Sequence, residues 1–221
     1  MHRAAAFFDL DRTLLTVNSG ALWMRRERRL GRISRWQLLQ GTAYLIGYKF
    51  SVIDMDRVTT EALKTVKGKR EETVRRWTRD WYRAEVAHHA APGAWAVLRA
   101  HRAARELLVL LTSSSPYESE IAGQQFGMDG VLSSRYEVVD GRFTGAPLQP
   151  ICYGAGKVTY AERYAAEHGV DLDRSFYYAD SMSDLPMLER VGNPRVVNPD
   201  PRLRCLARRR RWAVLDWRRG E

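Results

Sequence analysis

The sequence predicts an α/β fold in which a Rossmann-like parallel sheet carries the chemistry and helices interrupt the chain after the first strand. Two observations support this. Short apolar runs that end in polar side chains alternate with stretches of helical periodicity over most of the chain. After the first of these runs, residues 18–90 contain only helical patterns. We therefore expect a core formed by residues 1–17 and 91–221, with a helical insertion at 18–90.

The first predicted strand covers residues 4–8 and ends at two carboxylates and a hydroxyl, those of Asp9, Asp11 and Thr13. Continued strand alternation would point both aspartates to one side, at the end of the sheet where open α/β folds place their chemistry. Two carboxylates so close repel each other unless a cation lies between them. A surface turn in which an aspartate caps the next helix is the alternative interpretation.

The insertion repeats apolar side chains at helical spacing and predicts four helices without a strand. Its Trp and Tyr side chains are expected mainly to form the interior of this helical unit. The four helical stretches are residues 22–30, 36–46, 58–66 and 74–81.

From residue 92 the strand and helix pattern resumes. A β-hairpin with a type I′ turn at Asp140-Gly141 is predicted for residues 131–144. The serines before Pro116 suit a helix start whose free N–H groups face an anion. The other expected elements are helices at 93–104, 117–126 and 158–168, strands at 107–111, 176–179 and 191–197, and a final helix after residue 201.

Three later strands or turns also lead into polar residues. Thr112 and Ser113 follow the strand at 107–111, Lys157 follows a glycine-rich turn, and Asp180 and Asp184 follow the strand at 176–179. The glycine-rich turn lacks the spacing of a nucleotide triphosphate loop, so the lysine is the informative residue.

An acid pair, a hydroxyl, a lysine and a second acid pair, in this order, resemble the motifs of the haloacid dehalogenase superfamily of phosphotransferases. The segments DLDRTL, ADSMSDLPML and VVNPDPRL resemble its phosphoserine-phosphatase-like branch, subfamily IB. The resemblance extends from Phe7 to about Trp212, and Ala179 stands where the family usually has Gly. It implies a Rossmann-like core with a helical C1 cap, here residues 18–90, that closes over the active site.

The resemblance implies a Mg2+-dependent phosphatase that hydrolyses a small phosphomonoester. Asp9 would be the nucleophile that forms an aspartyl-phosphate, and Asp11 would act as general acid and base. The metal would be held by Asp9, the backbone carbonyl of Asp11 and Asp180. A carboxylate needs such a cation because the phosphate dianion otherwise repels it.

The remaining motif residues are expected to support this chemistry. Thr112, with the N–H of Ser113, would bind a phosphoryl oxygen, and Lys157 would neutralise another and hold the nucleophile. Asp184 is expected to orient Lys157 or a metal-bound water rather than to bind the metal directly. Helix capping by Thr112 and a solvent-exposed Lys157 are the alternatives.

Substrate selection is expected to depend on the start of the insertion. In phosphoserine phosphatases a Glu nine residues after the nucleophile meets the substrate ammonium, and the corresponding residue here is Asn18. An amide brings no charge, so phosphoserine is not the expected substrate. Trp23, Arg25 and Arg26 would suit a larger or more anionic leaving group. Glu27 or Glu61 could replace Asn18 from another helix.

Composition predicts a globular protein with a formal net charge of +10, which attracts anionic partners. The arginines cluster near residues 25–35 and 202–211, and solvated helix faces are favoured over a dedicated binding surface. Two lone cysteines, a start without a signal-peptide pattern and the lack of a long apolar stretch predict a cytoplasmic protein without a transmembrane helix. It would be a monomer or homodimer.

Two alternatives to a phosphatase remain at this point. One is a phosphotransferase that passes the phosphoryl group to another hydroxyl. The other is a protein whose basic segments bind nucleic acid or an anionic membrane while the acidic site is vestigial. The complete set of motif residues favours an enzyme, since one short motif arises by chance far more readily than four in order.

Overall fold

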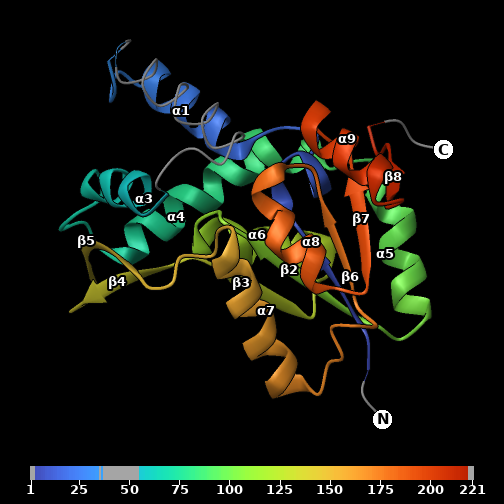
Figure 1. The fold of residues 1–221 in the computed structure, drawn as a ribbon. Helices are drawn as coiled ribbons and strands as arrows, with labels where there is room; N and C mark the ends of the chain where they lie inside the picture. The colour runs from blue at the N-terminus through green and yellow to red at the C-terminus, as the bar shows by residue number, and fades with distance from the viewer. Residues whose placement is uncertain (1–2, 35, 37–54, 219–221) are drawn as a thin grey trace.

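The computed structural model describes residues 3–34, 36 and 55–218, and its centre is a six-stranded parallel sheet with the order β3-β2-β1-β6-β7-β8 (Figure 1). The strands are short and almost wholly apolar, as expected for a sheet that is covered on both faces. Their bounds are β1 Ala5–Phe8, β2 Leu107–Thr112, β3 Gly130–Ser133, β6 Phe176–Ala179, β7 Asn193–Val197 and β8 Ala213–Leu215. The predicted parallel α/β fold is confirmed.

Alternate residues of each strand pack into two separate hydrophobic layers. Phe7 and Tyr177 face one layer, which is covered by the helices α7, α8 and α9. Phe8 and Tyr178 face the other layer, which is covered by α5 and α6. The helices are α5 Ala94–Ala103, α6 Pro116–Phe126, α7 Ala155–His168, α8 Leu185–Arg190 and α9 Pro201–Arg209.

The segment after β1 is helical in its described part. Helices α1 (Ser19–Arg29), α3 (Met55–Lys64) and α4 (Glu71–Trp81) correspond to three of the four predicted stretches, and a π-helical turn, η2 (Tyr82–Val86), leads back to the core. The predicted helix at 36–46 lies outside the described residues, apart from Trp36. These helices gather near the carboxyl ends of the strands (Figure 1).

The predicted hairpin at 131–144 is wrong in its first strand. The chain forms two strands there, separated at Ser134, whose hydroxyl accepts the backbone N–H of Cys152 at 3.0 Å. The first part is β3 of the main sheet, and only β4 (Arg135–Val139) pairs antiparallel with β5 (Arg142–Leu148). The turn itself is as predicted, since Asp140 and Gly141 both have positive φ, 49° and 70°.

This hairpin packs on the helical segment. Strand β5 contacts α3, and the backbone N–H of Gly68 donates to the carbonyl of Phe143 at 2.8 Å. Phe143 lies with Val74 and Tyr117 in a third, small apolar cluster. The hairpin therefore joins the helical segment to the core.

The segment that follows the C-terminal arginine cluster joins the sheet. After α9 the chain forms β8, which pairs parallel with β7, and then buries Trp217, which is 4% exposed. The Trp217 ring stacks on Tyr178 with a centroid distance of 5.2 Å. Strand β8 was not predicted, since three residues carry too little periodicity.

No helix in the described part of the chain is both long and apolar enough to cross a bilayer.

Replacing Trp217 by Ala should lower the free energy of unfolding by about 3–5 kcal/mol, because it empties a buried site against the sheet. Urea unfolding followed by circular dichroism measures this change. Trp36→Ala is the matched control, since Trp36 is 65% exposed and its loss should change stability by no more than about 0.5 kcal/mol. Equal losses in both variants would show that the C-terminal segment is not integrated into the core.

Candidate active site

The site is built from chain segments that leave the sheet at the carboxyl ends of β1, β2 and β6. Strand β1 ends at Phe8, and the backbone N–H of Asp9 still donates to the carbonyl of Tyr178 on β6 at 2.9 Å. Asp180 follows β6 directly. The two aspartates therefore lie side by side because neighbouring parallel strands end together.

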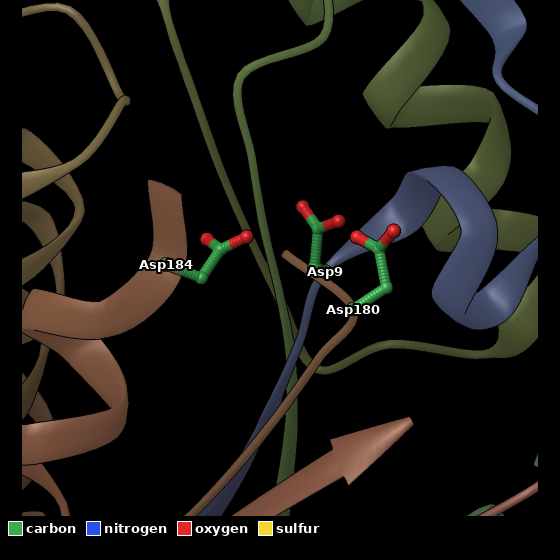
Figure 2. Close-up of side chains that lie close together, drawn as sticks. All are labelled: Asp9, Asp180 and Asp184. Atoms are coloured by element: carbon green, nitrogen blue, oxygen red, sulfur yellow. The ribbon is translucent and has the colours of Figure 1, made fainter. Parts of the chain in front are cut away.

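Three buried carboxylates converge at this edge. Oxygens of Asp9, Asp180 and Asp184 lie within 4.8 Å of one another, and Asp9 stands between the other two (Figure 2). Burial raises the pKa of Asp9 to about 7, the Lys157 ammonium opposes this shift, and Asp184 adds to it. Burial, together with repulsion from Asp9 and Asp184, also raises the pKa of Asp180 well above its usual range.

These residues fit a hard divalent cation. Oxygen donors with like charges, removed from water, are stabilised by a cation that carries two positive charges. Asp9 and Asp180 would hold such an ion. Asp184 is committed elsewhere, because its Oδ1 accepts hydrogen bonds from Lys157 and Tyr177, and its Oδ2 accepts one from Ser181.

Lys157 is buried beneath this cluster and contacts the central carboxylate. It lies in the first turn of α7 and is 0% exposed. Its Nζ donates to Asp9 Oδ1 at 2.8 Å and to Asp184 Oδ1 at 2.5 Å. The predicted grouping of Lys157 with both aspartates is therefore present in the structure, whereas the alternative of a solvent-exposed lysine is wrong.

Asp11 is positioned by a turn and not by strand alternation as predicted. The chain turns after Asp9, with Arg12 in the left-handed region at φ 58°. Asp11 Oδ1 accepts the backbone N–H of Ser19 at 2.9 Å, and its Oδ2 accepts the amide of Asn18, also at 2.9 Å. Burial raises the pKa of Asp11, and the bonds from Ser19 oppose this. A carboxyl that keeps its proton more readily suits a general acid.

Thr112 ends β2 and is 2% exposed, with its Oγ1 accepting the N–H of Ser114 at 3.2 Å. Ser113 begins the loop that leads into α6. Strand β2 is the other neighbour of β1, so Thr112 lies beside the start of the Asp9 turn. The structure brings all four predicted motif segments to one edge of the sheet.

The predicted specificity residues are engaged in contacts within the protein. Asn18 caps α1 through Oδ1 and donates to Asp11, so neither end of its amide is free. Trp23 packs edge-on against Trp81 at a centroid distance of 5.0 Å, and the Arg26 guanidinium lies over the Trp23 ring. Arg25 is exposed. The sequence did not predict the contact between Trp23 and Trp81, which joins residues distant in the chain.

The sequence analysis missed two buried polar residues. Tyr177 lies on β6, three residues before Asp180, and its hydroxyl bonds to both Lys157 and Asp184. Glu118 resembles the last residue of a capping box that begins at Ser115. It is only 6% exposed, and its Oε1 has no hydrogen-bond partner among the residues described. Burial and the neighbouring Asp11 raise the pKa of Glu118 to about 8.

Comparison with known proteins gives a consistent family. A model described as haloacid dehalogenase-like hydrolase matches residues 6–189. The protein named phosphoserine phosphatase SerB1 of Mycobacterium tuberculosis is 32% identical over 221 residues, which cover 97% of this chain and 71% of the relative. The protein named histidinol-phosphatase of Neisseria meningitidis serogroup C is 25% identical over 218 residues, which cover 96% of this chain and 98% of the relative.

A solved structure shares the whole architecture. The crystal structure of a Bordetella pertussis Tohama I protein of unknown function superposes with a TM-score of 0.87 at 27% identity. The match covers 98% of this chain and 100% of that chain.

Because the pKa of Asp9 is raised, the stability of the folded protein should respond to pH and to a bound cation in a way that tests metal binding. Burial raises the pKa of Asp9 to about 7, whereas the ordinary pKa of an aspartate is 3.8, so without a cation the folded state keeps this proton to a higher pH than the unfolded state. The folded state thus binds more protons than the unfolded state in this window, so this group makes the protein less stable as pH rises through it. A cation on Asp9 and Asp180 would remove that cost and compete with the proton.

We therefore expect Mg2+ to raise the melting temperature more at pH 8 than at pH 6, measured by differential scanning fluorimetry. Asp180→Asn should abolish most of the increase at both pH values. An increase that is the same at pH 6 and pH 8, or that survives in the variant, would contradict this assignment of the metal ligands.

Proposed function

Because the chain belongs to the haloacid dehalogenase-like hydrolase family, we propose that it is a Mg2+-dependent phosphatase of small phosphomonoesters with Asp9 as nucleophile. The observation that carries the proposal is the buried triangle in which Lys157 joins Asp9 and Asp184 beside Asp180. Two relatives named as phosphatases, over nearly the whole chain, support the reaction class.

In the first half of the reaction, Asp9 Oδ attacks phosphorus and the bond to the leaving oxygen breaks. Mg2+ held by Asp9, the Asp11 carbonyl and Asp180 would neutralise the phosphoryl oxygens. The charge of Lys157 would neutralise one of those oxygens, and the Thr112 hydroxyl, with the Ser113 N–H, would bind another and keep the phosphoryl group in line. The product of this half is an aspartyl-phosphate on Asp9.

Asp11 connects the two halves of the reaction. Its carboxyl proton passes to the leaving alkoxide, and the resulting carboxylate then takes a proton from the water that attacks the aspartyl-phosphate. The held position of Asp11, with both oxygens hydrogen-bonded to the start of α1, supports this role. Such a group contributes about 10²–10⁴-fold in rate.

We propose that residues 18–90 form a cap over this site. The described helices lie near the carboxyl ends of the strands (Figure 1), and Trp23 and Trp81 connect α1 to the end of α4. The complete buried site argues against a vestigial one.

The basic segments do not need a dedicated partner to explain them, since Arg210 pairs with Glu189 at 2.5 Å and Arg29 with Glu85 at 2.6 Å.

Asp9→Asn should abolish turnover of p-nitrophenyl phosphate while the protein still folds, because the amide is nearly isosteric but cannot attack phosphorus. Asp11→Asn should slow an alkyl phosphate by about 10²-fold or more and p-nitrophenyl phosphate much less, since a good leaving group needs little protonation. Steady-state kinetics with each ester, with and without EDTA, measures the activity losses of the two variants. Wild-type rates in Asp9→Asn would exclude the covalent mechanism.

The relatives are named for two different substrates, phosphoserine and histidinol phosphate, so the substrate must be determined by experiment. Asn18 offers no charge to an ammonium group, and its amide is already bonded to Asp11. We expect phosphoserine to show a kcat/KM at least about tenfold below that of the best ester in a panel of phosphorylated metabolites, which corresponds to about 1.4 kcal/mol. Phosphoserine in first place by a wide margin would refute this argument.

A further inference from the structure

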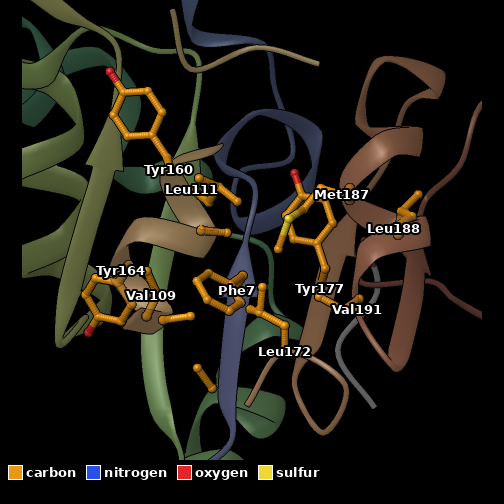
Figure 3. Close-up of a cluster of buried hydrophobic side chains, with 14 of the residues drawn as sticks. Phe7, Val109, Leu111, Tyr160, Tyr164, Leu172, Tyr177, Met187, Leu188 and Val191 are labelled. Carbon is orange, nitrogen blue, oxygen red and sulfur yellow. The ribbon is translucent and has the colours of Figure 1, made fainter. Parts of the chain in front are cut away.

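Tyr177 is the third polar partner of the buried lysine. Its ring lies in the apolar layer beneath the sheet edge, close to Met187 and Val191 (Figure 3), and the side chain is 0% exposed. Its hydroxyl accepts from Lys157 Nζ at 3.0 Å and donates to Asp184 Oδ1 at 2.6 Å. The ring of Tyr177 thus belongs to the hydrophobic core, while its hydroxyl bonds to the charged groups of the site, Lys157 and Asp184.

The Tyr177 hydroxyl is one of three oxygen acceptors around the Lys157 ammonium. An ammonium carries three N–H groups, and the structure gives them three acceptors, the oxygens of Asp9, Asp184 and Tyr177. Asp184 Oδ1 in turn accepts from both Lys157 and Tyr177. Because the tyrosine ring is fixed by packing, its hydroxyl determines where the two charged groups meet.

Without the Tyr177 hydroxyl, Asp184 and Lys157 could take other positions in the site. Asp184 is near enough to Asp9 and Asp180 to join a metal site, and the flexible lysine stem allows several positions of its ammonium. A rigid neutral group that binds both partners directs Asp184 to Lys157 and Lys157 to Asp9. No charge is added to the site by this group, since burial raises the pKa of the Tyr177 phenol and keeps it protonated.

We propose that Tyr177 is a positioning residue that holds Lys157 and Asp184 together so that the lysine ammonium stays directed at the nucleophile Asp9. This inference rests on the proposed phosphatase function and adds a residue to its machinery. Tyr177 acts through Lys157 and does not contact the substrate.

Tyr177→Phe tests the role, and Tyr178→Phe is its matched control. Tyr178 is the next residue of β6, is 4% exposed, and its hydroxyl bonds to His101 Nε2 at 2.7 Å on the opposite face of the sheet. Each variant removes one buried, hydrogen-bonded hydroxyl from the same strand. We therefore expect similar decreases in melting temperature for the two variants. A difference in their activities would then reflect the positions of Lys157 and Asp184 and not a general loss of stability.

Only Tyr177→Phe should lower kcat, by between about tenfold and a hundredfold, while KM changes less than about threefold. The reduction should be the same for p-nitrophenyl phosphate and glycerol phosphate, because the acid Asp11 is untouched. Equal activity of the two variants, or a lower KM with unchanged kcat, would overturn the proposal. A larger loss for glycerol phosphate would also overturn it, since that pattern belongs to the general acid.

Crystal structures of the wild type and Tyr177→Phe give a readout that needs no turnover. We expect Asp184 or the Lys157 ammonium to shift in the variant, so that the distance from Nζ to Asp9 Oδ1 exceeds its present 2.8 Å by more than coordinate error. An unchanged Lys157, Asp9 and Asp184 arrangement would refute the positioning role. A wild type inactive on every phosphomonoester would refute the proposed function, and the crystal comparison would still decide the role of Tyr177.

Discussion

The structure depends on one buried ionic contact, the ammonium of Lys157 between Asp9 and Asp184. A charged group removed from water costs several kcal/mol unless opposite charges and hydrogen bonds surround it. Here α7, β1 and the turn after β6 each supply one of the three groups, so the contact forms only when these elements are in place. Chemistry and stability therefore share the same interaction, and a change to either aspartate should lower the free energy of unfolding as well as activity, although Asp9→Asn should still fold.

The sheet topology explains why the polar residues of the site gather at one edge. Strand β1 lies in the middle, between β2 and β6, and all three carry side chains buried on both faces. Polar residues that follow such strands must gather at one edge, because parallel strands end on the same side. The C-terminal strand β8 and Trp217 extend the sheet and cover the face opposite the lysine.

Much of this arrangement could be predicted from the sequence, since Asp9, Thr112 and Asp180 each follow an apolar run. The position of Lys157 followed only from the resemblance, because a helix-start lysine has no local signal of burial. Tyr177 could not be predicted, since strand periodicity identifies its ring as core and says nothing of its hydroxyl. The hairpin error has a similar cause, because the break between β3 and β4 falls at Ser134, which bonds to Cys152, 18 residues later.

Asp11 is attached to the helical segment more firmly than to the sheet. One oxygen accepts from the backbone at the start of α1 and the other from the side chain that caps that helix. Asp11 is thus bound to the start of α1 through its side chain, whereas Asp9 is bound to β6 through its backbone N–H. In the proposed mechanism, the separation between the nucleophile Asp9 and the general acid Asp11 would therefore depend on the position of α1.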